Sequence, residues 1–68
     1  MRYTKAEMII IASRAEARCE NPKYKNIMEK FDRVLAGKTK NVRLNTNEKD
    51  LISYMVEDKP EIVAKIYK

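Results

Sequence analysis

The sequence contains no histidine and only one cysteine, Cys19. A single cysteine cannot form a disulfide within the chain, which fits a reducing compartment. The usual zinc sites are excluded because they need several imidazole or thiolate ligands. The lack of an imidazole removes the side chain most often used as a general base, and there is no glycine-rich phosphate loop. We therefore expect no metal site, no cofactor and no enzyme active site.

Glycine and proline are also scarce, with one Gly and two Pro. An all-β domain needs a turn about every ten residues, so this scarcity argues against one. The longest apolar run, Met8 to Ala12, is far shorter than the roughly 20 residues that span a bilayer. The Met1-Arg2 start does not have a signal-peptide pattern. We expect no membrane partner and a cytoplasmic location, in the producing cell or in a host cell if the gene belongs to a mobile element.

The residues that are present indicate a folded domain. Hydrophobic residues make up 44% of the chain and charged residues 37%, which is too apolar for disorder. The 68 residues allow one domain, spanning 1–68. A chain of this length buries only about 60% of the surface that its unfolded form exposes, so the core is expected to be thin.

The first predicted helix begins after Thr4 and continues to the Asn21-Pro22 step. Thr4 and Glu7 have the spacing of a capping box. One apolar face recurs with helical spacing and comprises Met8, Ile11, Ala12, Ala15 and Cys19. Because Cys19 is on this face and has no histidine to activate it, burial as a small hydrophobe is favoured over a role as a nucleophile.

The second predicted helix begins at Pro22, with Asn21 as its N-cap, and ends before Gly37. It carries the cleanest amphipathic pattern in the chain, formed by Tyr24, Ile27, Met28, Phe31, Val34 and Leu35. Tyr24 also could stack on a nucleic-acid base, but its place in the pattern favours the core. Two helices joined by so short a connection are expected to form an antiparallel hairpin.

The second half of the chain is less regular. Val42-Arg43-Leu44 is a candidate extended segment. Asn45, Thr46 and Asn47 can each cap a third helix, so its start is ambiguous, and Asn45 has the better capping box, with Glu48 three residues later. Pro60 opens a last piece, 61–67, whose β-branched residues suit either a helix or a strand. The predicted fold is all-α: a small bundle of three to four short helices that starts with the antiparallel hairpin.

The net charge of +5 is concentrated in residues 22–43, which contain seven cations and two acids. The candidate binding residues in and after the second helix are Lys23, Lys30, Arg33, Lys38, Lys40 and Arg43. This positive surface fits phosphates or an acidic protein surface. A solvated face explains the same charges, and the C-terminal end of a helix favours nearby cations such as Lys38 and Lys40 for structural reasons.

Two further patterns are better explained by structure than by function. Glu57, Asp58 and Glu61 flank the end of one helix and the start of the next, where acids serve capping and the helix dipole. The segment 48–67 has the length of a helix-turn-helix motif. However, its second helix is short and nearly neutral, whereas a recognition helix presents basic or amide side chains.

Apolar residues exceed what so small a chain can obviously cover, and the candidate interface residues are Ile9, Ile10, Tyr54 and Tyr67. In size, Lys/Asn/Ile-rich composition and lack of a signal peptide, the chain resembles small accessory proteins of bacterial phages, a general likeness without a specific motif. That likeness implies inhibition or redirection of a host enzyme. The first hypothesis is a non-enzymatic regulatory or inhibitory protein that occupies a surface of a larger protein, with a homodimer left open. The alternative is a small basic nucleic-acid-binding protein that uses residues 22–43.

Overall fold

A computed structural model describes residues 3–67. The Met1-Arg2 start, on which the expected location partly depended, and Lys68 lie outside this range. Four helices follow one another along the chain: α1 (Lys5–Glu16), α2 (Pro22–Leu35), α3 (Thr46–Met55) and α4 (Pro60–Ile66). No strand occurs in residues 3–67, so the all-α prediction is confirmed and the last piece is a helix.

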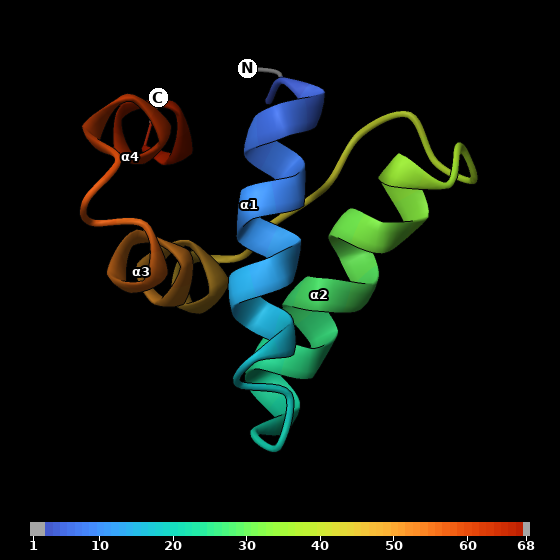
Figure 1. Cartoon of the computed structure of the whole chain (residues 1–68), viewed down its shortest axis with the longest axis horizontal. Helices are drawn as coiled ribbons and strands as arrows, with labels where there is room; N and C mark the ends of the chain where they lie inside the picture. The colour runs from blue at the N-terminus through green and yellow to red at the C-terminus, as the bar shows by residue number, and fades with distance from the viewer. Residues whose placement is uncertain (1–2, 68) are drawn as a thin grey trace.

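Helices α1 and α2 form the predicted antiparallel hairpin (Figure 1). The Thr4 backbone N–H donates to Glu7 Oε1 at 2.8 Å, and the Glu7 N–H donates back to Thr4 Oγ1 at 3.1 Å, which completes the capping box. At the start of α2, Asn21 Oδ1 accepts the Lys23 N–H at 3.0 Å. In the view of Figure 1, α1 lies between α2 on one side and α3 and α4 on the other.

Gly37 ends α2 in the left-handed conformation, with φ of 77°. The Gly37 N–H donates to the Val34 carbonyl at 3.0 Å, and the Lys38 N–H donates to the Arg33 carbonyl at 2.9 Å. This pair of bonds is the Schellman motif, which satisfies carbonyls left free at a helix end. The only glycine in the sequence is therefore used where a residue with a Cβ would be strained.

The core lies between the hairpin and the second pair of helices. Its buried apolar residues come from all four helices and from the turn after α3: Ile11, Ala12, Ala15, Ile27, Phe31, Ile52, Met55, Val56, Ile62 and Ile66. Phe31 is fully buried, and the Tyr3 ring meets it edge-on with centroids 5.7 Å apart. Tyr24 packs against this core, as its place in the pattern predicted.

The connection between α2 and α3 contains the candidate extended segment. Val42 and Leu44 pack against the core while Arg43 between them is exposed, but the segment has no strand partner in the described part of the chain. The α3 cap is as predicted: the Glu48 N–H donates to Asn45 Oδ1 at 2.8 Å, and Glu48 Oε1 accepts the Asn45 N–H at 3.0 Å.

Cys19 is exposed, so the prediction that it is buried is wrong. Helix α1 ends at Glu16, before Cys19 is reached. The Arg18 and Cys19 N–H groups then donate to carbonyls three residues back, those of Ala15 at 3.0 Å and Glu16 at 3.2 Å. Because these turns contain fewer residues than an α-helical turn, Cys19 no longer lies on the apolar face of α1.

The capping role expected of Asp58 is also wrong. Helix α4 has no side-chain cap, and its N-cap residue is Lys59. Asp58 instead pairs with Arg14 of α1 through two hydrogen bonds of 2.5 and 3.1 Å, while Arg14 also donates to the Met55 carbonyl at 2.6 Å. Arg14 therefore fastens the end of α3 to α1.

Three ion pairs occur within residues 3–67, and each joins the hairpin to the second half of the chain. They are Arg14–Asp58 at 2.5 Å, Lys30–Glu48 at 2.6 Å and Lys65–Glu7 at 2.6 Å. None of the helices in this part of the chain has the length and apolar character needed to cross a membrane.

Candidate functional site

The loop after α2 presents its charges outward because its apolar residues are turned inward. Val42 and Leu44 pack against the core. Lys38, Lys40 and Arg43 are exposed, and none of the three forms an ion pair within the described range. This alternation fixes the loop on the body of the protein and leaves its cations available to a partner.

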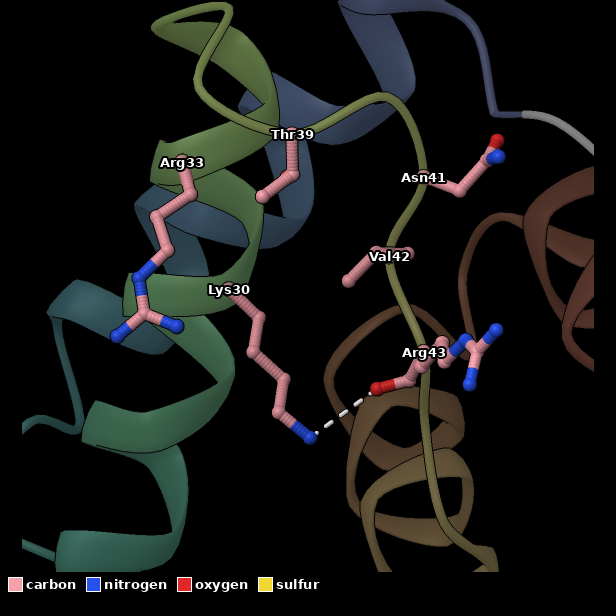
Figure 2. A pocket seen from close by; sticks show the side chains of 6 residues that line it. All are labelled: Lys30, Arg33, Thr39, Asn41, Val42 and Arg43. Atoms are coloured by element: carbon pink, nitrogen blue, oxygen red, sulfur yellow. Dashed lines mark hydrogen bonds between the residues drawn. The ribbon is translucent and has the colours of Figure 1, made fainter.

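A shallow hollow lies between this loop and the C-terminal half of α2 (Figure 2). Its volume is about 250 Å³, and it is lined by Lys30, Arg33, Thr39, Asn41, Val42 and Arg43. We call it the α2 hollow. Three of the six predicted basic residues therefore line one surface feature, together with hydroxyl and amide groups that can also bind phosphate oxygens.

Lys30 has a structural role in this hollow. Its ammonium group donates to Glu48 Oε1 at 2.6 Å and to the Arg43 carbonyl at 3.1 Å, the second of which is drawn in Figure 2. Glu48 is buried. Because the Lys30 charge is matched by a buried carboxylate, it adds little to the outward positive field.

The two arginines of the α2 hollow do not converge on one point. In Figure 2 the Arg33 side chain points away from the loop, and the Arg43 side chain lies on the other side of the loop from Arg33 and Lys30. A compact ligand needs convergent donors, whereas a long anionic chain can contact charges spread over a surface. The arrangement favours the second kind of partner.

The other predicted basic residues are placed less uniformly. Lys38 and Arg33 border a further hollow beside the acids Glu29 and Asp32, so the charge on that side of α2 is mixed. Lys23 is in the first turn of α2, ten residues before Arg33 and thus about 15 Å away along the helix. The structure therefore groups the basic residues at the end of α2 and does not bring Lys23 to them.

The candidate apolar interface residues are spread over different elements. Ile9 on α1 is 48% exposed, Tyr54 on α3 is 75% exposed, and Tyr67 after α4 is 55% exposed. Ile10 is half-buried and packs against the core, which removes it from the exposed set. The Tyr67 hydroxyl donates to Asp50 Oδ1 at 2.7 Å, so its polar end is already engaged.

Two carboxylates are held in their charged form by neighbouring cations. The Arg14 side chain lowers the pKa of Asp58 through their hydrogen bonds. Lys65 lowers the pKa of Glu7, and the Thr4 backbone N–H adds to this effect. Both groups link the two halves of the molecule.

The acidic residues do not form a recognisable metal site. Within residues 3–67, no group of three His, Cys, Asp or Glu side chains lies close enough to hold a metal ion. The second helix of the helix-turn-helix candidate is α4, which has seven residues and Glu61 in its first turn. Neither feature adds a functional residue to the basic surface.

Comparisons with protein-family models, curated proteins and solved structures find no match to this chain. Its function must therefore be inferred from the arrangement of its own residues.

Proposed function

We propose that this chain is a non-enzymatic binding protein that holds nucleic acid by its phosphate backbone. The surface consists of Arg33, Lys38, Lys40 and Arg43 around the loop after α2. The observation that carries the proposal is the exposure of these four cations without ion pairs in residues 3–67. Arg33 lies near the end of α2, and the other three lie on the loop, whose apolar residues Val42 and Leu44 are partly buried and pack against the core. Backbone contacts of this kind supply most non-specific nucleic-acid affinity.

The lack of an aromatic residue in the segment 32–43 favours phosphates over an acidic protein surface. Protein interfaces obtain most of their affinity from a few desolvated residues at their centre, among which Trp and Tyr are enriched together with Arg. The loop's own apolar residues, Val42 and Leu44, are packed against the core. Lys, Arg, Thr and Asn side chains are the groups that commonly contact phosphate and sugar.

A second candidate function is supported by a different observation, the high exposure of Tyr54. Tyrosine is enriched in the energetic centres of protein interfaces. In this alternative the chain is a regulatory or inhibitory protein, of the kind found among phage accessory proteins, that occupies a surface of a larger protein or of a second copy. Recovery of one stoichiometric protein partner by the natural chain, and its loss with Tyr54→Ser, would favour this alternative.

Salt-dependent binding to labelled DNA tests the first proposal. Fluorescence anisotropy with duplex and single-stranded DNA should show micromolar binding in ~50 mM salt and a steep loss of affinity as salt rises. The variant Lys38→Gln/Lys40→Gln/Arg43→Gln should lose nearly all binding. Its matched control, Lys5→Gln/Lys23→Gln/Lys25→Gln, removes the same charge from exposed positions on α1 and α2 and should retain most of it.

Two results would contradict the proposal. One is no detectable binding to either DNA form in ~50 mM salt, where backbone contacts are strongest. The other is an equal loss of affinity in the loop variant and its control, since this would mean that net charge, rather than the loop surface, drives binding. Helical circular dichroism on both variants establishes that they remain folded.

A further inference from the structure

A second hollow lies on the opposite side of the loop from the α2 hollow. It has a volume of about 330 Å³ and is bordered by the loop residues Val42 to Leu44, by Lys49 of α3, by Lys65 of α4 and by Tyr3. We call it the α3–α4 hollow. Val42 and Arg43 line both hollows, so the loop forms a ridge between them.

The α3–α4 hollow has an excess of positive charge. Arg43, Lys49 and Lys65 line it, and no acidic residue of the described range does. Lys65 is paired with Glu7 at 2.6 Å, so its charge is matched. Arg43 and Lys49 form no ion pair within residues 3–67. The Arg43 guanidinium lies on this side of the ridge, away from Lys30 and Arg33 (Figure 2).

The other groups around Lys49 also suit an anion. Lys49 is in the first turns of α3, close to the positive end of the helix dipole. Tyr3 also lines this hollow, and burial raises the pKa of its phenol, with a further contribution from Glu7. A tyrosine phenol is neutral at physiological pH and can donate its proton. The hollow therefore offers two unmatched cations and a neutral donor.

The geometry points to a continuous path for the nucleic-acid backbone that crosses the loop, with Lys49 as a phosphate-binding residue on its far side. This inference rests on the proposed function and extends it. Arg33 marks the path on one side of the ridge, Arg43 stands on the ridge, and Lys49 marks the other side. Nothing in the residue pattern singled out Lys49, because it lies outside the positively charged stretch 22–43 and next to the acids Glu48 and Asp50.

The variant Lys49→Gln tests this path, with Lys25→Gln as its matched control. Both lysines occupy the fourth position of a helix, and the substitution removes one positive charge in each. Loss of one phosphate contact should weaken duplex binding by about tenfold in ~50 mM salt and reduce the slope of log affinity against log salt by about 0.9. Lys25→Gln should change neither quantity appreciably, and Lys49→Arg, which keeps the charge, should bind like the natural chain.

The results separate this inference from the function on which it rests. If the natural chain binds DNA but Lys49→Gln has the same affinity and salt slope as Lys25→Gln, the crossing path is wrong and the loop surface remains. If the natural chain does not bind DNA, the proposed function itself is wrong. A smaller slope for Lys49→Gln that is restored in Lys49→Arg supports the path, because a general loss of stability would not depend on charge in this way.

Discussion

The hairpin and the second half of the molecule are each stabilised by a different kind of contact. Within residues 3–37, two helices that follow each other directly in the chain bury apolar residues against one another. Residues 38–67 form two shorter helices, which are joined to the hairpin by three ion pairs as well as by the core. The first half is stabilised by packing between helices that are adjacent in sequence. The second half depends on contacts between residues that are distant in sequence.

This difference has a consequence for function. The loop with the basic surface lies at the boundary between the two halves, and the Lys30–Glu48 pair and the Arg43 carbonyl hold that boundary together. The loop thus obtains a fixed position without using its outward cations. A surface fixed in this way binds with less loss of conformational freedom than a flexible basic tail would.

The largest expected effect is loss of the fold when the shared core receives a charge. Phe31→Asp places an unpaired carboxylate at a position that is 0% exposed, which so small a domain cannot tolerate. We expect loss of most helical circular dichroism and no cooperative thermal transition. Because the core includes residues of both halves, α3 and α4 should unfold together with the hairpin.

Tyr54→Asp provides the control for this prediction. It introduces the same charge at a side chain that is 75% exposed, and surface changes of this kind usually alter stability by less than about 0.5 kcal/mol. Persistence of the hairpin's helical signal in Phe31→Asp, or equal destabilisation by both variants, would contradict the picture of one shared core.

The same contrast between the halves explains which parts of the fold the sequence could predict. Capping pairs, Gly37 and the apolar pattern of α2 act through neighbours within one or two turns, so the hairpin and its N-caps were predicted correctly. For α3 the sequence left three N-caps open and favoured Asn45, which is the one that the structure has. Whether Cys19 is buried or exposed depends on where α1 ends. Helix ends are set by competing turn geometries, which the residue pattern does not resolve. Whether 61–67 was helix or strand was open because β-branched residues suit both.

The candidate site was predictable in part for a similar reason. The local density of positive charge predicted a basic surface that includes the loop after α2, where the structure groups the exposed cations. It could not indicate that Lys30 is matched by Glu48, or that Lys49 faces the same loop, because both facts depend on how α3 packs against the hairpin. Ile10 shows the same limit, since only the packed structure reveals that it is partly covered.

A smaller effect is expected from breaking the ion pair beside the loop. Lys30→Met keeps the apolar stem but leaves the buried Glu48 carboxylate with the Asn45 N–H as its remaining donor among the described residues. Since Lys30 is one-third exposed, water compensates part of the loss, and we expect destabilisation of about 2 kcal/mol by urea unfolding.

The double variant Lys30→Met/Glu48→Gln sharpens this test. A neutral Gln keeps the capping-box spacing and removes the unpaired charge, so it should recover part of the lost stability. If Glu48→Gln destabilises Lys30→Met further, the carboxylate has a source of stabilisation other than Lys30, and the pair does not fix the boundary between the halves.

The smallest effect concerns the Arg14–Asp58 and Lys65–Glu7 ion pairs and is visible as a dependence of stability on pH. The pKa values of Asp58 and Glu7 are lowered in the folded protein, so these groups bind protons less readily when folded than when unfolded. Their contribution is present above the unfolded pKa values, near pH 4, and is lost as the pH falls through the folded ones. The thermal midpoint should therefore decrease below about pH 4.5, and Asp58→Asn should reduce that dependence, whereas Glu57→Gln should preserve it.

Because the Asp58 side chain is 58% exposed, the difference between Asp58→Asn and the natural chain should shrink in high salt. A pH profile that Asp58→Asn leaves unchanged would mean that Arg14 holds α3 through the Met55 carbonyl alone, and that the two halves depend on one fewer ion pair than their geometry indicates.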